Sequence, residues 1–236
     1  MTRVRIMLAV AAVAMGVGLW FALTAPPDTL QGVYSRLFHI HVPSLWLGFL
    51  AFFVTCFGSI AWLVRNRPRW DRLASSSVEI GVLFTGIGLV TGMIWGRAVW
   101  GTAWDWGDPR LATTAVMFFV YLGYLALRAA IDDPVIRARR SAILGAVAVV
   151  QVPLVYFSVY MFRTLHQTPT IRPDRATMPR EMTIAFLVNL VAFTILYVAL
   201  MIARTDLAAA EEAQKGRQIL AGEAVGAPRM NEIEDV

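Results

Sequence analysis

Only one cysteine occurs among the 236 residues, and this scarcity excludes several kinds of function. Cys56 has no partner for an intramolecular disulfide, and the chain has neither a C-x-x-C thiol-exchange motif nor the C-x-x-C-H motif of covalent haem attachment. A G-x-x-x-x-G-K-[ST] phosphate loop is also missing, so we do not expect this chain to hydrolyse nucleotides by itself. Cys56 lies in the middle of an apolar run, where we expect a small packing residue.

Charged residues are scarce as well, at 16%, while hydrophobic residues reach 58%. Soluble domains have about 25% charged and 45–50% apolar residues. The apolar excess falls into runs that approach the roughly 20 residues needed to cross a bilayer as a helix. The runs are 5–23, 44–64, 78–94, 112–127, 141–162 and 183–203. The sequence therefore predicts an all-α integral membrane protein with six transmembrane helices, the first retained because it is longer than a signal-peptide core of about 7–15 residues.

Basic residues are distributed unevenly between the two sets of connecting segments. The N-terminus, the segments after the second and fourth runs and the C-terminal tail hold fourteen Lys and Arg, against seven in the other segments. Because cytoplasmic segments attract Lys and Arg, both termini are predicted to be cytoplasmic. The net charge of +5 is then a signal of topology and gives no reason to expect nucleic acid as a partner.

This topology divides the chain into two parts. Residues 1–203 are predicted to form one transmembrane domain, with an aromatic-rich outer segment at about 95–114. Residues 204–236 are predicted to be a cytoplasmic tail, helical through Leu220 and then disordered.

All three histidines, His39, His41 and His166, fall on the predicted outer side. Pro43 fits the first turn of the second helix, which places His41 at the mouth of that helix. There the positive end of the helix dipole favours the neutral imidazole, the form that binds metals. Taken singly, His41 could be an inert interfacial residue and His166 a solvated loop residue. Together they could meet one metal: zinc would need three or four ligands, whereas haem needs two axial ones.

The segment "VWGTAWDWGDPRLATT" (99–114) concentrates tryptophans on the same side. Trp100 and Trp104 would share a face if this stretch were helical. Asp108 could pair with Arg110, or Arg110 could hold a haem propionate. An ordinary aromatic belt at the membrane interface would explain the tryptophans without any ligand.

Three blocks of the chain resemble one protein family. "WGTAWDWGDPRLATT" (100–114) is similar to the WWD signature of haem-handling proteins. "HVPSLW" (41–46) and "QVPLVYFSVYMFRTLHQ" (151–167) resemble two further blocks of its cytochrome c maturation branch, haem exporter protein C (CcmC). The resemblance covers residues 35–203, in the expected order.

The resemblance implies a haem-binding and haem-transfer protein of the inner membrane, not an enzyme. It implies b-type haem held non-covalently at the outer, periplasmic face by two axial histidines, His41 and His166. The implied haem platform consists of Trp95, Trp100, Trp104, Trp106, Asp108 and Arg110. The implied partners are a periplasmic haem chaperone, to which haem is delivered, ABC transporter subunits and a small membrane subunit.

The sequence departs from the family pattern at a few positions. Ala103 replaces one of the paired tryptophans, Gly107 separates Trp106 from Asp108, and Ala112 interrupts the usual Leu-Thr. His39 stands where the family has an aromatic residue, which suggests a packing residue or a gate.

Three alternatives remain at this stage: an electron-transfer cytochrome b, a structural permease partner without haem, and a related haem–cytochrome c ligase. The cytochrome is disfavoured because no predicted span contains a histidine, and the ligase because such proteins have larger chains with more membrane histidines.

Overall fold

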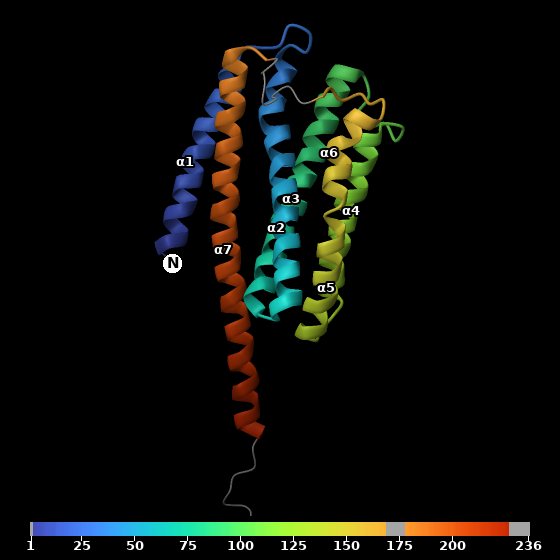
Figure 1. Ribbon diagram of the computed structural model, residues 1–236. Coiled ribbons are helices and arrows are strands. Elements are labelled where there is room, and N and C mark those ends of the chain that lie inside the picture. The colour runs from blue at the N-terminus through green and yellow to red at the C-terminus, as the bar shows by residue number, and fades with distance from the viewer. Residues whose placement is uncertain (1, 169–177, 227–236) are drawn as a thin grey trace, which may run out of the picture.

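The computed structural model describes residues 2–168 and 178–226, which form a helical bundle with no strand among them (Figure 1). Six of its helical segments are long and apolar enough to cross a membrane, which confirms the predicted fold class. The elements are α1 (Thr2–Thr24), the 3-10 helix η1 (Val33–Leu37), α2 (Phe38–Arg65), α3 (Pro68–Trp100), α4 (Pro109–Ala129), α5 (Pro134–Ala148), α6 (Gln151–Met161) and α7 (Arg180–Gly226).

Local sequence explains most helix boundaries. Asp108 and Asp133 are the N-caps of α4 and α5, and in each case the carboxylate accepts two backbone N–H groups of the first turn. A proline follows each cap, at the position where its missing N–H costs nothing. The fifth predicted span is divided into α5 and α6 because Pro153 has no N–H to donate to the carbonyl of Val149.

The start of the second helix differs from the prediction. α2 begins at Phe38, directly after η1, so Pro43 lies inside the helix and not in its first turn. His39 and His41 are therefore residues of α2, within a segment apolar enough to span the membrane. The expectation that no span contains a histidine was wrong for this helix, because η1 leads into α2 without an intervening loop. His166 lies outside the helices, after α6.

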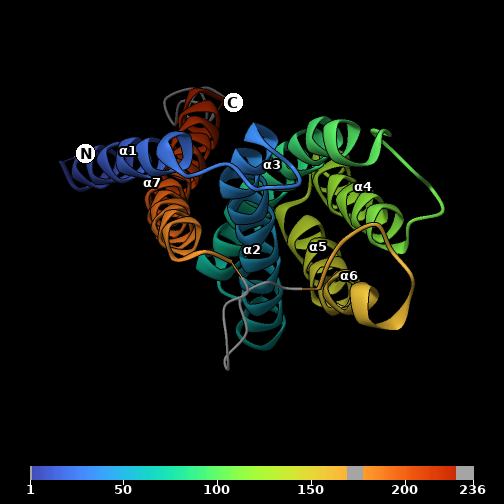
Figure 2. The same ribbon diagram turned by 90° about the horizontal axis from the view of Figure 1, so that it is seen from above.

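The helices pack around α2 and α3 (Figure 2). Seen along the bundle, α1 and α7 lie on one side of this central pair and α4, α5 and α6 on the other. Phe52 of α2 stacks on Tyr121 of α4 with ring centroids 3.6 Å apart. Gly81 of α3 allows this approach, because a Cβ atom there would meet the Phe52 ring at 2.7 Å. On the opposite side, buried Asn189 of α7 donates to the carbonyl of Gly18 in α1 at 2.9 Å.

Ion pairs connect the helices at the end of the bundle where α2 meets α3. Arg128 of α4 donates to both oxygens of Asp71 at 2.6 and 2.9 Å. Arg204 of α7 makes a similar two-point contact with Glu79.

α7 continues past this end without interruption to Gly226, so the helical part of the expected tail is an extension of the last helix (Figure 1). The helix continues past Leu220, where the sequence predicted its end, to Gly226. The rest of the predicted disordered end, 227–236, lies outside the described residues.

Candidate functional site

Three connecting segments meet at the other end of the bundle, which is uppermost in Figure 1 and is called the upper end below. They are residues 25–37 before α2, residues 101–108 between α3 and α4, and residues 162–168 after α6. The alternating direction of the helices brings them together, and with them the residues that the sequence singled out. The histidines and tryptophans that the sequence predicted to lie on one side of the membrane therefore lie at a single end of the molecule.

His41 lies in the first turn of α2 and packs against α3. Its Nδ1 is 2.9 Å from the carbonyl oxygen of Gly88 and 3.3 Å from Oγ1 of Thr91. Since a carbonyl only accepts, Nδ1 is the donor, and in the neutral imidazole Nε2 then keeps its lone pair. No described residue is a hydrogen-bond partner of Nε2, so the tautomer is the one that ligates a metal through Nε2.

The contact between His41 and α3 depends on a glycine. A Cβ atom at Gly92 would lie 2.8 Å from Cε1 of His41, closer than real Cβ contacts allow. Trp95, one turn further along α3, contacts the same ring edge-on at 5.7 Å between centroids. Gly92 and Trp95 therefore form the α3 side of the histidine's surroundings.

His166 is held by Asp108, the N-cap of α4. Asp108 Oδ2 accepts the hydroxyl of Thr164 at 2.5 Å and the N–H of Leu165 at 2.6 Å. The other oxygen, Oδ1, accepts the backbone N–H groups of Arg110 and Leu111 and lies 3.6 Å from Nδ1 of His166. This carboxylate thus joins the segment after α6 to the start of α4, and no described residue hydrogen-bonds Nε2 of His166.

The surroundings of these two residues shift their pKa values. Burial lowers the pKa of His166 to about 4; the positive charge of Arg110 acts in the same direction, and the Asp108 carboxylate opposes both. Burial by itself would raise the pKa of Asp108, but the hydrogen bonds that it accepts outweigh this and place its pKa below the usual value. At neutral pH His166 is therefore an uncharged imidazole beside an ionised carboxylate.

His41 and His166 come from different segments of the upper end and lie within electrostatic reach of each other and of Arg110. Arg110 forms no hydrogen bond or ion pair through its guanidinium within the described part of the chain, and Asp108 binds its backbone N–H instead. The structure therefore lacks the Asp108–Arg110 side-chain pair that the sequence allowed, and a propionate held by Arg110 stays a prediction. Two tyrosines of α6, Tyr156 and Tyr160, lie within reach of the same charge.

The four tryptophans do not form one continuous surface. Trp95 contacts His41, and Trp100 contacts His166 edge-on at 4.9 Å. Trp104 and Trp106 contact each other at 5.1 Å. The expected shared face of Trp100 and Trp104 was wrong, because α3 ends at Trp100 and Gly101 follows in the left-handed conformation at φ 75°.

His39 is completely buried, and neither ring nitrogen has a hydrogen-bond partner among the described residues. Its ring lies edge-on to Phe38 at 5.6 Å. Residues two apart on a helix point in nearly opposite directions, so His39 does not share the side of α2 occupied by His41. The packing role predicted for it agrees with this burial.

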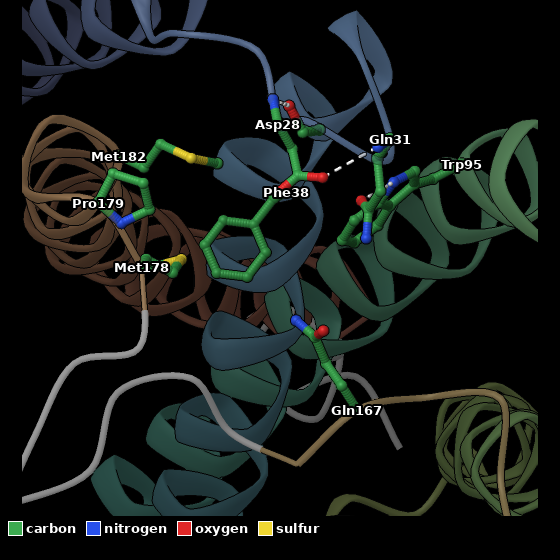
Figure 3. Close-up of a pocket in the computed structure, with 9 residues that line it drawn as sticks. Asp28, Gln31, Phe38, Trp95, Gln167, Met178, Pro179 and Met182 are labelled. Atoms are coloured by element: carbon green, nitrogen blue, oxygen red, sulfur yellow. Dashed lines mark hydrogen bonds between the residues drawn. The ribbon is translucent and has the colours of Figure 1, made fainter.

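A pocket of about 170 Å³ lies next to Trp95, on the side toward α7 (Figure 3). Gln31, a residue that the sequence did not point to, accepts the Trp95 indole N–H at 3.1 Å through Oε1. Met178, Pro179 and Met182 form the opposite wall of the pocket. The pocket is too small to enclose a porphyrin.

Several contributing residues lacked a sequence signal. Gln31 and Thr164 act through contacts across 64 and 56 residues of chain, which no local pattern reveals. Tyr156 and Tyr160 do show helical spacing, four residues apart. No cluster of three or more His, Cys, Asp or Glu able to hold a metal ion occurs in the part of the chain that the structure describes, so zinc with three or four protein ligands finds no support.

Comparison with known proteins gives one consistent result. The family model described as heme exporter protein C matches residues 1–219. A heme exporter protein C of Bradyrhizobium diazoefficiens is 38% identical over 81% of this chain and 73% of its own length. One from Haemophilus influenzae is 34% identical over 81% and 78%. An Arabidopsis thaliana mitochondrial protein, described as ccmC-like and assigned to cytochrome c biosynthesis, is 32% identical over 81% and 76%. The chain belongs to the heme exporter protein C family.

Proposed function

We propose that this protein binds haem b at the upper end of its bundle, through His41 and His166, and passes it on during the maturation of c-type cytochromes. The observation that carries the proposal is that two histidines from distant segments lie at the same end of the bundle, within electrostatic reach of each other. Each has Nδ1 beside an acceptor oxygen, and no described residue hydrogen-bonds its Nε2. Two imidazole ligands satisfy haem iron, whereas they are too few for zinc.

The rest of the upper end suits a porphyrin. Trp95 and Trp100 lie beside the two histidines and offer apolar edges and faces. The free guanidinium of Arg110 provides a partner for a propionate carboxylate. Trp104 and Trp106 extend the aromatic surface, and Trp106 is 68% exposed, as a residue at the open rim of such a site would be. Asp108 contributes to haem binding indirectly, because it holds the segment that carries His166.

The upper end is the outer, periplasmic end in this proposal. The ion-paired end near Asp71 and Arg128 carries the excess of basic residues, which favours a cytoplasmic location for that end and for both termini. The 1–203 bundle is then the haem-handling domain, and the part of α7 beyond it is the cytoplasmic tail. Haem held at the upper end would be accessible to a periplasmic chaperone, and ABC transporter subunits and a small membrane subunit would be further partners. The protein acts as a carrier and not as an enzyme.

The test is the absorption spectrum of the purified full-length protein, supplied with haem, in wild type and three variants. We expect a six-coordinate, low-spin spectrum in wild type and its loss in His41→Ala and His166→Ala. His39→Phe, which fills the buried volume with an apolar ring, serves as the control and should retain the spectrum. Six-coordinate haem that persists in both alanine variants would contradict the proposal.

A further inference from the structure

The two histidines differ in what lies behind them. His41 directs Nδ1 to a neutral backbone carbonyl, that of Gly88, at 2.9 Å. Nδ1 of His166 lies 3.6 Å from the charged Oδ1 of Asp108 and 3.5 Å from the neutral hydroxyl of Thr164. A carboxylate behind a metal-binding histidine makes the imidazole a stronger electron donor than a neutral carbonyl does.

The carboxylate is built to remain charged in this position. The Asp108 side chain is only 2% exposed, and its two oxygens accept four hydrogen bonds from Thr164, Leu165, Arg110 and Leu111. Three of these donors are backbone N–H groups, which bring no formal charge. Since the guanidinium of Arg110 makes no ion pair with Asp108, the carboxylate is not directly neutralised on the side facing His166.

We propose that Asp108 is a positioning residue that makes His166 the stronger axial ligand, so that haem iron separates from His41 first when haem leaves. The inference rests on the proposed function, because it concerns the two ligands named there. A negative charge behind one ligand stabilises ferric over ferrous iron, so it lowers the midpoint potential of the bound haem. It also strengthens the bond of iron to that histidine, while the bond to His41 has no such support.

The first experiment measures the midpoint potential of haem bound to the full-length protein by optical redox titration. Asp108→Asn removes the charge, and we expect a shift to more positive potential with the six-coordinate spectrum retained. Asp108→Glu restores a carboxylate and should return the potential toward the wild-type value. Thr164→Val leaves the charge of Asp108 in place and removes only a neutral hydroxyl, which donates to Asp108 and also contacts Nδ1 and the backbone N–H of His166. Its potential should therefore stay closer to the wild-type value than that of Asp108→Asn.

These variants distinguish an electronic effect of Asp108 on His166 from a purely structural role of Asp108. If Asp108 only held the 162–168 segment, Asp108→Asn and Thr164→Val would both lose six-coordinate haem and neither would shift the potential. An unchanged potential in six-coordinate Asp108→Asn would overturn the inference. If Asp108→Asn fails to hold haem, Asp108→Glu decides between the two roles. A potential equal to wild type in Asp108→Glu supports the role of the charge, and a clear shift to more positive potential opposes it.

The second experiment addresses the order of release. We expect His41→Ala to retain a larger fraction of haem, as a five-coordinate species on His166, than His166→Ala retains on His41. Greater retention in His166→Ala would overturn the inference. A wild-type protein without histidine-ligated haem would instead contradict the proposed function itself, so the two failures are distinguishable.

Discussion

The backbone N–H of Leu165 donates a 2.6 Å hydrogen bond to Asp108 across 57 residues of chain. Because Asp108 is also the N-cap of α4, this bond sets the position of His166 relative to α4. The aromatic segment 101–108 and the histidine after α6 are thereby parts of one structure. The Trp100–His166 contact on the same side strengthens the connection.

Replacing Gly92 tests the packing of His41 on α3. Gly92→Ala places a Cβ atom 2.8 Å from the His41 ring, so we expect the imidazole to move and six-coordinate haem to be lost. The measurement is haem bound per protein, with the absorption spectrum. Gly123→Ala in α4 is the control, because no atom lies within 4 Å of its added Cβ; it should leave haem unchanged, since Ala in a helix is favoured over Gly by about 1 kcal/mol. Equal haem content in both variants would contradict this account.

Thiol labelling tests the orientation of the bundle. In a Cys56→Ala background, cysteines at Leu30 and Asp105 should react with a membrane-impermeant reagent added to intact spheroplasts, because both residues are exposed at the upper end. A cysteine at Asp132, exposed at the opposite end, should react only after the membrane is opened. Labelling of Asp132→Cys in intact spheroplasts would mean that the proposed orientation is inverted.

Variants of two equally exposed tryptophans can distinguish a haem platform from a membrane belt. Trp106 and Trp20 are each 68% exposed, but only Trp106 belongs to the aromatic segment beside the site. We expect Trp106→Ala to weaken haem retention, Trp106→Phe to preserve part of it, and Trp20→Ala to leave it unchanged. An aromatic pair contributes roughly 0.5–1.5 kcal/mol beyond area burial, so the loss should be about two- to tenfold. The measurement is haem remaining after washing with apomyoglobin, and equal retention in Trp106→Ala and Trp20→Ala would support a simple belt.

The half-buried His166 predicts a dependence of stability on pH. Its pKa is about 4 in the folded protein, below the ordinary value of 6.5, so the unfolded chain binds more protons between these values. The contribution of His166 to stability is therefore constant above pH 6.5 and decreases as the pH falls toward 4. Thermal unfolding of the haem-free protein should show this decrease, and His166→Gln should reduce it. An identical pH profile in the variant would show that His166 does not titrate as expected.

Much of the architecture follows directly from the sequence. Six apolar runs in a chain with 16% charged residues determine six membrane helices, because a buried backbone in lipid must satisfy its own hydrogen bonds. Their alternation then places His41, His166 and the tryptophans at one end. Asp-Pro pairs at 108–109 and 133–134 likewise determine where α4 and α5 begin, because cap and proline act locally.

Other features were decided only by the tertiary structure. The continuation of α2 back to Phe38 was not predicted, and in the structure η1 leads directly into the helix. Whether Asp108 would pair with Arg110 was open in the sequence. In the fold, the 164–165 segment supplies donors that occupy Oδ2 of Asp108, and its carboxylate forms no ion pair with the Arg110 guanidinium. The partners of the two histidines, Gly88 and Asp108, lie 47 and 58 residues away along the chain. Contacts over such separations arise from how helices pack, and no local pattern of residues encodes them.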